Sequence, residues 1–315
     1  MSDNEKHVPA CLKRGTAFLL LAFGGADSIE NVEPFVKNIL KGRIVTQELV
    51  EKAKDRYRII GGKSPLLAIT LLQAKAIEEA LKKEGFDYSP YVGMRYWHPF
   101  IKDTLAKMKG DGITRAIAVV MAPFSTQAAT GGYEIDTQIA TKELGGAPKV
   151  EFTSIWHLKP LFIEAVADNL NAQLDFFKDK KDVLVIFSVH SLPTQTLEGD
   201  PYEMMISQSA EKVVAKASCD YKIAYQSKGA GPKEWMGPST EDVIEQAKKS
   251  GKKGVIVVPF GFAADHVETL YDIDVLFKAF AESKGLVFKR CASLNANPKF
   301  IAAIADVIKR HSEGR

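Results

Sequence analysis

One stretch constrains the fold of this chain most, Val255–Asp274. It begins with an unbroken apolar, β-branched run, Val255–Val258, which is typical of a strand buried on both faces of a parallel sheet. Pro259-Phe260-Gly261 ends the run, and a helical pattern starts at Asp265. Strand, turn and helix in this order form the unit of a doubly wound α/β sheet, whose ligands bind beyond the carboxyl ends of the strands. We therefore expect a site just after this strand.

The polar residues at the start of this helix allow two interpretations. Asp265-x-x-Glu268 has the spacing of a capping box, in which both side chains only satisfy the helix N-terminus. His266 and Glu268 also stand where an α/β sheet holds its ligand, and a histidine beside a carboxylate suits proton transfer near neutral pH. Spacing alone does not choose between capping and chemistry.

The same order of elements occurs twice along the chain. Apolar runs predict strands at 16–23, 91–96, 116–121 and 150–155, and again at 183–187, 221–226, 255–258 and 286–289. Helical patterns alternate with them at 28–40, 66–84, 101–109, 133–144, 160–177, 202–217, 241–249 and 298–311. We predict an α/β protein of two similar Rossmann-like doubly wound lobes, each with a four-stranded parallel sheet, and a cleft between them.

The length of 315 residues fits two such lobes. We place the N-terminal lobe at residues 1–160 and the C-terminal lobe, which carries the metal site, at residues 161–315. The last helix, 298–311, is free to cross back to the first lobe.

Composition excludes several classes of protein. A net charge of +3, without basic runs, argues against a nucleic-acid partner. Cys11, Cys219 and Cys291 are far apart, which argues against a disulfide framework or a cysteine-based metal site and favours a cytoplasmic protein. Residues 1–14 are polar, so we expect them to be neither a signal peptide nor a membrane span.

A second titratable residue favours chemistry over capping at Glu268. His190 ends the strand that begins at residue 183, and the strand ends of one doubly wound lobe meet at the same edge. Glu268 and Asp272, spaced i and i+4, share a helix face. His190 with Glu268 suits a general base or a transient divalent-metal site. The alternative is a loop histidine held by hydrogen bonds and a solvated acidic row at a helix N-terminus.

Several motifs occur in order along nearly the whole chain. They are Tyr57-Arg-Ile-Ile-Gly-Gly-Lys-Ser-Pro65, Gly93-Met-Arg-Tyr-Trp-His-Pro99, Phe187-Ser-Val-His190-Ser-Leu-Pro193, Tyr225-Gln-Ser-Lys228, Trp235-x-Gly237-Pro238, Pro259-Phe-Gly-Phe-Ala-Ala-Asp-His-Val-Glu268 with its continuation to Asp274, and Ser293-Leu-Asn-x-Asn-Pro298. Together these motifs resemble ferrochelatase. The resemblance implies insertion of ferrous iron into a porphyrin, the closing step of haem biosynthesis, by a lyase-class enzyme that has iron as its substrate and no resident cofactor.

The resemblance assigns roles to individual residues. It makes His190 and Glu268 the catalytic and metal-binding pair, supported by His266 and Asp272. Whether His190 acts as base or as ligand stays open. Arg56, Tyr57, Ser64 and Tyr133 match positions that contact the porphyrin in the short bacterial members, and Trp235 matches a tryptophan of the cleft. With these five we expect Phe23 to contact the porphyrin.

Three substitutions depart from the family pattern. Phe23 stands where some members have a metal-facing tyrosine or methionine, Leu40 replaces a basic porphyrin contact beside Lys41, and Leu276 replaces a third acid after Glu268 and Asp272. There is no cysteine-bearing C-terminal extension, so no iron–sulfur cluster is expected. The segment from Asn38 to Tyr57 is short and lacks the extended apolar lip of the membrane-bound eukaryotic enzymes. We expect a monomer whose membrane contact is at most peripheral.

The identity of the ring is the main open question. We expect protoporphyrin IX, converted to protohaem, with coproporphyrin III as the alternative. The short lip favours the type that uses coproporphyrin, whereas Phe23 and Leu40 depart from that type's tyrosine and arginine. Less favoured are a cobalt chelatase for another tetrapyrrole, whose family shares the two-lobe plan in usually shorter chains, and a porphyrin carrier without catalysis.

Overall fold

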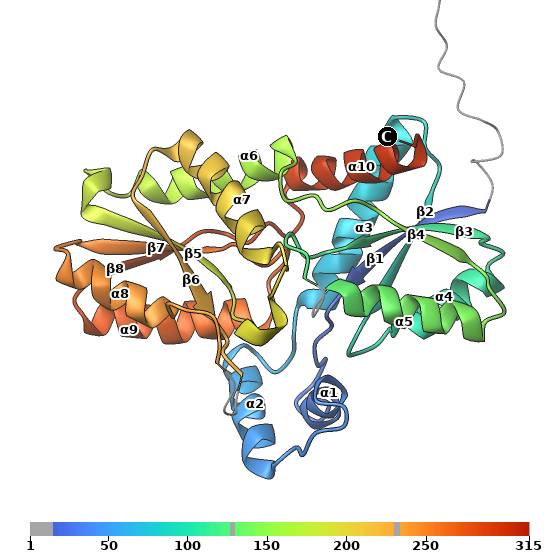
Figure 1. Ribbon diagram of the computed structural model, residues 1–315, viewed down its shortest axis with the longest axis horizontal. Coiled ribbons are helices and arrows are strands. Elements are labelled where there is room, and N and C mark those ends of the chain that lie inside the picture. Colours follow the sequence, from blue (N-terminus) through green and yellow to red (C-terminus); the bar gives the residue numbers. More distant parts are fainter. Residues whose placement is uncertain (1–14, 127–129, 230–233, 315) are drawn as a thin grey trace, which may run out of the picture.

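The computed structural model describes residues 15–126, 130–229 and 234–314, and in it two four-stranded parallel sheets lie side by side (Figure 1). The strand orders are β2-β1-β3-β4 and β6-β5-β7-β8. Counted within each half of the chain, both sheets have the same order, namely second, first, third and fourth strand. The predicted pair of doubly wound lobes is therefore confirmed. The strands are β1 (Thr16–Ala22), β2 (Ser89–Met94), β3 (Arg115–Val120), β4 (Lys149–Phe152), β5 (Val183–His190), β6 (Tyr221–Gln226), β7 (Gly254–Pro259) and β8 (Val287–Arg290).

The central strands form because their residues are apolar on both faces. All seven residues of β1 and all six of β7 are buried, as the unbroken apolar runs predicted. In the register of the first sheet, Leu20 lies between Val92 and Val119. This arrangement brings the carboxyl ends of the inner strands of each sheet to one edge.

Helices cover both faces of each sheet. They are α1 (Val32–Ile39), α2 (Gln47–Ile59), α3 (Leu66–Lys83), α4 (Ile101–Gly110), α5 (Thr130–Glu143), α6 (Pro160–Leu174), α7 (Tyr202–Ala217), α8 (Thr240–Lys249), α9 (Lys278–Ser283) and α10 (Pro298–Ser312), with the short 3-10 helices η2 (Lys180–Asp182) and η3 (Thr194–Thr196). The segment before α9 is a π-helix, η4 (Glu268–Phe277), which the sequence did not predict. A π-helix is rare and often marks a functional site.

Helix α2 was not predicted. Its sequence is strongly charged and buries only Val50 and Tyr57, so the apolar period is weak. The Thr46 hydroxyl caps the helix by accepting a hydrogen bond from the Leu49 amide. Together α1 and α2 project from one side of the two lobes (Figure 1).

The final helix does cross back toward the first lobe. By sequence α10 belongs to the proposed lobe 161–315, yet it packs against α3 as well as α6 (Figure 1). An ion pair between Lys309 and Glu84 adds to the α3 contact, and Lys159 Nζ lies 3.1 Å from Asp306. We keep 1–160 and 161–315 as proposed lobes that share this helix at their junction.

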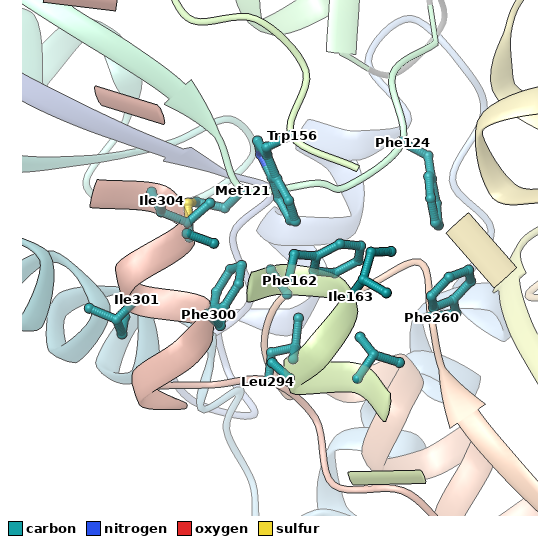
Figure 2. Close-up of a cluster of buried hydrophobic side chains, with 14 of the residues drawn as sticks. Met121, Phe124, Trp156, Phe162, Ile163, Phe260, Leu294, Phe300, Ile301 and Ile304 are labelled. Atoms are coloured by element: carbon teal, nitrogen blue, oxygen red, sulfur yellow. The ribbon is translucent and has the colours of Figure 1, made fainter. Parts of the chain in front are cut away.

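One continuous apolar core joins the two lobes. Figure 2 shows its aromatic centre, where Trp156 from the first lobe meets Phe162 of α6 and Phe300 of α10. The Trp156 and Phe162 rings lie 5.2 Å apart, and Phe162 stacks on Phe260 at 6.3 Å. The carboxyl ends of the strands in both sheets are therefore supported by one packed core.

Two further expectations concern termini and membranes. In residues 15–126, 130–229 and 234–314, no helix is long and apolar enough to cross a bilayer. The prediction for residues 1–14, and with it Cys11, falls outside the residues that the structure describes.

Candidate active site

A cavity of about 420 Å³ opens between the lobes at the carboxyl ends of the strands. This volume is typical of pockets that hold a small organic ligand. The first lobe contributes residues that follow β1, β2 and β3, and the second contributes residues that follow β5 and β7. The lining is mainly apolar and aromatic, and includes Phe23, Phe35, Tyr96, Phe124, Tyr133, Tyr202 and Phe262.

His190 and Glu268 lie next to each other in the wall of this cavity that the second lobe forms. His190 is the last residue of β5 and Glu268 the first of η4, and His190 Nε2 lies 3.6 Å from Glu268 Oε1. His190 Nδ1 lies 2.5 Å from the Ser191 carbonyl oxygen, so Nδ1 carries the proton and donates it there. The neutral ring then presents the lone pair of Nε2 to Glu268 and to the cavity.

His266 has the opposite tautomer. The Thr269 amide donates to His266 Nδ1 over 3.3 Å, so the proton of the neutral ring is on Nε2. That Nε2 lies 3.8 Å from Glu268 Oε2. His190 therefore faces Glu268 with the ring nitrogen that can bind a metal or a proton, whereas His266 faces it with an N–H. The two histidines cannot exchange roles without rearranging their backbone partners.

The electrostatics of these three groups differ. Burial raises the pKa of Glu268, but His190, His266 and Arg56 lower it by more, to about 2. Burial lowers the pKa of His190, but the Glu268 carboxylate, the Ser191 carbonyl and Asp272 together raise it by more, so the pKa is raised overall. Burial lowers the pKa of His266 below 6.5. Glu268 is thus an anion next to an imidazole that holds protons well and another that stays neutral.

Asp272 continues the acidic row into the protein. The Ser227 hydroxyl donates to Asp272 Oδ2 over 2.7 Å, while Oδ1 has Arg56 Nη1 at 3.7 Å and no hydrogen bond from the described residues. Burial raises the pKa of Asp272 and the Glu268 charge raises it further, to about 6. The row of acidic side chains ends at Asp272, because the next position in it is Leu276, which has no carboxylate. The Leu276 side chain is 39% exposed.

The capping-box interpretation of Asp265 and Glu268 is wrong. The N-cap position is Val267, without a side-chain cap, and the Glu268 carboxylate faces the two histidines. Asp265 instead binds Arg290 and neighbouring polar side chains. The local cap is formed instead by His266 and Thr269, whose side chains each accept the backbone amide of the other.

Replacing Asp272 by asparagine is expected to stabilise the fold at neutral pH. The side chain is 4% exposed, and its pKa is about 6 in the folded protein against 3.8 in the unfolded chain. The protein therefore loses stability as the pH rises from about 4 to about 6 and Asp272 ionises, and it regains this stability below pH 4. Asp272→Asn should raise the free energy of unfolding by about 1–3 kcal/mol at pH 7.5 and by much less at pH 4. Urea unfolding at both pH values measures this. Asp111→Asn, at an exposed carboxylate that is hydrogen-bonded to Lys107, is the control and should not stabilise. An equal gain for Asp272→Asn at both pH values would contradict the expectation.

The structure brings together only some of the predicted porphyrin contacts. Phe23, Ser64 and Tyr133 line the cavity, but Arg56, Tyr57 and Trp235 are not among the described lining residues. Tyr57 is 2% exposed, and its hydroxyl accepts a hydrogen bond from the Ala26 amide at 3.0 Å. In its present position it supports the wall rather than forming it.

Trp235 and Arg56 lie at the margins of the site. Trp235 forms an antiparallel bridge with Pro193, and a Cβ at Gly229 would collide with its ring. Arg56 extends from α2 to Asp272 and lies over the Tyr271 ring at 5.3 Å. It therefore joins the α1–α2 projection to the π-helix.

Arg95 and Tyr202 also line the cavity, although the resemblance assigned them no role. Arg95 is one of three cations, with Arg56 and Lys63, that the sequence offers as partners for ligand carboxylates. Arg95 lies between the rings of Tyr96 and Tyr133, at 5.0 and 5.4 Å, and pairs with Asp136 at 2.8 Å. Its place directly after β2 follows the strand-end rule, so the sequence contained a signal for it. Tyr202 donates to the His190 carbonyl over 2.9 Å, a contact that no sequence pattern indicates.

Comparison with known proteins decides the family. The ferrochelatase family model matches residues 15–312. The chain belongs to the ferrochelatase family. A curated ferrochelatase of Deinococcus radiodurans is 34% identical over 298 residues, which cover 93% of this chain and 94% of the relative. One of Herpetosiphon aurantiacus is 36% identical over 298 residues, covering 93% and 98%. The resemblance stated from the motifs is confirmed, and the chain is a metal chelatase.

Relatives within the ferrochelatase family differ in their named ring. A protein of Halalkalibacterium halodurans, named coproporphyrin III ferrochelatase, is 34% identical over 303 residues, covering 95% of this chain and 97% of the relative. The family therefore places this chain in haem and porphyrin biosynthesis with iron as a substrate, without identifying the ring.

Solved structures with the same fold belong to more distant chelatases. SirB from Bacillus subtilis with Fe3+ superposes with a TM-score of 0.58 at 11% identity, covering 96% of this chain and 98% of that one. CbiX, described as the terminal enzyme of siroheme biosynthesis in denitrifying bacteria, gives 0.54 at 11% identity.

Proposed function

We propose that this ferrochelatase inserts Fe2+ into protoporphyrin IX, with His190 and Glu268 at the metal. The observation that carries the proposal is the position of His190 Nε2, 3.6 Å from the Glu268 carboxylate at the wall of an aromatic-lined cavity. An imidazole and a carboxylate form a suitable site for transient binding of ferrous iron. Porphyrin and ferrous iron are then the two substrates.

The cavity suits a flat apolar ring with carboxylates on its rim. The first-lobe wall supplies aromatic surface through Phe23 and Tyr96, whose rings lie 4.6 Å apart. Arg95, Ser64 and Tyr133 supply polar atoms along the same wall. In our proposal, contacts at the rim hold the ring bent, which exposes nitrogen lone pairs toward His190 and Glu268.

Insertion replaces two pyrrole N–H bonds by bonds from nitrogen to iron, and iron remains divalent. Two protons must therefore leave the ring, and we place their departure on the side of His190 and Glu268. We assign the first to His190 Nε2, which accepts it in the neutral form of the ring once iron has moved into the porphyrin. Asp272, with a pKa of about 6, is the next acceptor along the row, and Glu268 stays ionised between them.

The charge of the cavity favours the ring with fewer carboxylates. Protoporphyrin IX has two propionates and coproporphyrin III has four. Among the described lining residues Arg95 is the sole lysine or arginine, and it is already paired with Asp136. Additional propionates would enter a mainly apolar lining, where unpaired charge is costly. The second candidate, coproporphyrin III, is favoured by the relative from Halalkalibacterium halodurans.

We expect kcat/KM for iron insertion to be at least about tenfold higher with protoporphyrin IX than with coproporphyrin III, because each unpaired buried carboxylate costs at least 1 kcal/mol. Anaerobic assays with ferrous iron, read by the absorption change on metallation, measure both. A preference for coproporphyrin III would overturn the choice of ring. Porphyrin binding without metallation would indicate a carrier, and cobalt insertion into sirohydrochlorin alone would indicate the other chelatase class.

A further inference from the structure

A buried polar cluster lies behind the proposed metal site. It consists of Asp265, Arg290, Ser293 and Asn295, which we call the Asp265 cluster. Asp265 accepts hydrogen bonds from the Arg290 guanidinium, from the Ser293 hydroxyl at 2.6 Å and from the Asn295 amide at 2.9 Å. The Asp265 backbone amide donates to Asn295 Oδ1 over 2.9 Å. The side chains of Asp265 and Arg290 are 17% and 16% exposed, so these bonds are largely shielded from water.

Arg290 holds the segment that contains Glu268 at two points. Nη2 binds Asp265, before the π-helix, and Nη1 binds Asp274, within it, at 2.9 Å. Glu268 and Asp272 lie between these points. A planar guanidinium with several fixed donors can join two carboxylates in this way, which an ammonium group cannot do with the same geometry. The i→i+5 hydrogen bonding of a π-helix is uncommon, so external contacts that fix its two ends have a clear physical role.

The cluster reaches Glu268 through Thr269 and His266. The Thr269 hydroxyl lies 3.1 Å from Asp265 Oδ1 and accepts the His266 amide at 3.0 Å. The Thr269 amide in turn holds His266 Nδ1, which leaves Nε2–H directed at Glu268. A shift of Asp265 would therefore be transmitted to the ring that orients Glu268.

The same cluster is tied to the first lobe. Gln73 of α3 is fully buried, and its Nε2 donates to the Ala263 and Asn295 carbonyls at 3.1 and 2.9 Å. Asn295 has φ +43°, a left-handed conformation that asparagine tolerates better than most residues. Gln73 also lines the cavity, so this contact connects the Asp265 cluster with the wall that faces a bound ring.

We propose that Arg290 is a positioning residue that clamps the segment from Asp265 to Asp274 and thereby aims His266 and Glu268 at His190. The inference rests on the proposed function of that pair. No cavity-lining role is assigned to Arg290, which acts only through Asp265 and Asp274. Partners that orient metal-binding side chains typically change activity by 10–100-fold when they are removed.

The test compares two variants. Arg290→Lys keeps the positive charge but loses the planar guanidinium that binds two carboxylates, and Asp274→Ala removes only the contact between Arg290 and Asp274. In iron-insertion assays we expect Arg290→Lys to lower kcat by about 10–100-fold with the porphyrin KM within about twofold of the parent value. Asp274→Ala should show a smaller loss of kcat with the same pattern. Arg115→Lys, at an arginine paired with Glu151 in the first sheet, is the matched control and should change neither value.

A second measurement does not depend on turnover. Nitrogen NMR of the His266 imidazole should show the Nε2–H tautomer in the parent protein and a tautomer mixture in Arg290→Lys. An unchanged kcat and tautomer in both variants, or a rise of porphyrin KM that matches the fall of kcat, would overturn the clamp. If Arg290→Lys does not fold, Asp274→Ala decides by the same criteria. A parent protein that metallates no porphyrin would instead refute the proposed function, and the tautomer would still test the clamp.

Discussion

His190→Ala is expected to lower kcat for iron insertion by about 10²–10⁴-fold, the usual contribution of a positioned proton acceptor. The substitution removes the Nε2 lone pair that lies 3.6 Å from Glu268, and with it both a metal ligand and a base. It also removes the strongest influence that lowers the pKa of Glu268, so this pKa should rise from about 2. Porphyrin affinity should change little, because His190 is one residue in a large apolar lining. Stopped-flow metallation and porphyrin fluorescence titration measure the two effects separately.

The chain offers a matched control for this variant. His311 Nε2 also lies 3.6 Å from a glutamate, Glu151, but at the far edge of the first sheet. His311→Ala should leave turnover within about twofold, since surface ion pairs of this kind contribute little. Near-normal turnover of a folded His190→Ala protein would remove His190 from the mechanism, whatever the family resemblance implies.

The four inner strands, β1, β3, β5 and β7, were predictable because both of their faces are buried. In a chain of this composition, an unbroken apolar run such as Leu19–Leu21 predicts a strand buried on both faces. Because the order of these runs occurs twice, it also predicted two similar lobes. Helix α2 was missed for the opposite reason. It packs only a narrow stripe against α1 and the aromatic cluster around Tyr57, so its sequence is mostly that of a solvated surface.

The candidate site was predictable as far as topology goes. His190 ends β5 and Glu268 begins the helix that follows the adjacent strand β7, and parallel strands bring such residues together. The tautomers were not predictable, because they depend on the Ser191 carbonyl and the Thr269 amide, whose directions follow from loop geometry. The contact between Arg290 and Asp265 was also not predictable, because 25 residues separate them and because the spacing of Asp265 and Glu268 is equally typical of a capping box.

Phe162→Ala is expected to lower the free energy of unfolding by about 3–5 kcal/mol, the usual cost of removing a buried aromatic ring. Phe162 is fully buried at the start of α6, between Trp156 and Phe260 (Figure 2). Its ring packs against apolar side chains and makes no hydrogen bond, so the loss consists of burial and a cavity. Urea unfolding followed by circular dichroism measures it, and Phe176→Ala is the control. Phe176 is 61% exposed just beyond α6, where its ring contacts Lys289, so that variant should lose less than about 1 kcal/mol.

The shape of the transition carries the stronger test. Phe162 belongs to the core that is shared by both lobes, together with Trp156 from one side and Phe260 from the other. If this core makes the lobes one cooperative unit, Phe162→Ala should move a single transition to lower urea without splitting it. Two separate transitions would mean that each lobe is stable by itself and that α10 only links them. A loss below about 1 kcal/mol would contradict the tight packing around Phe162, because a ring of this size leaves a cavity that neighbouring side chains cannot fill without strain.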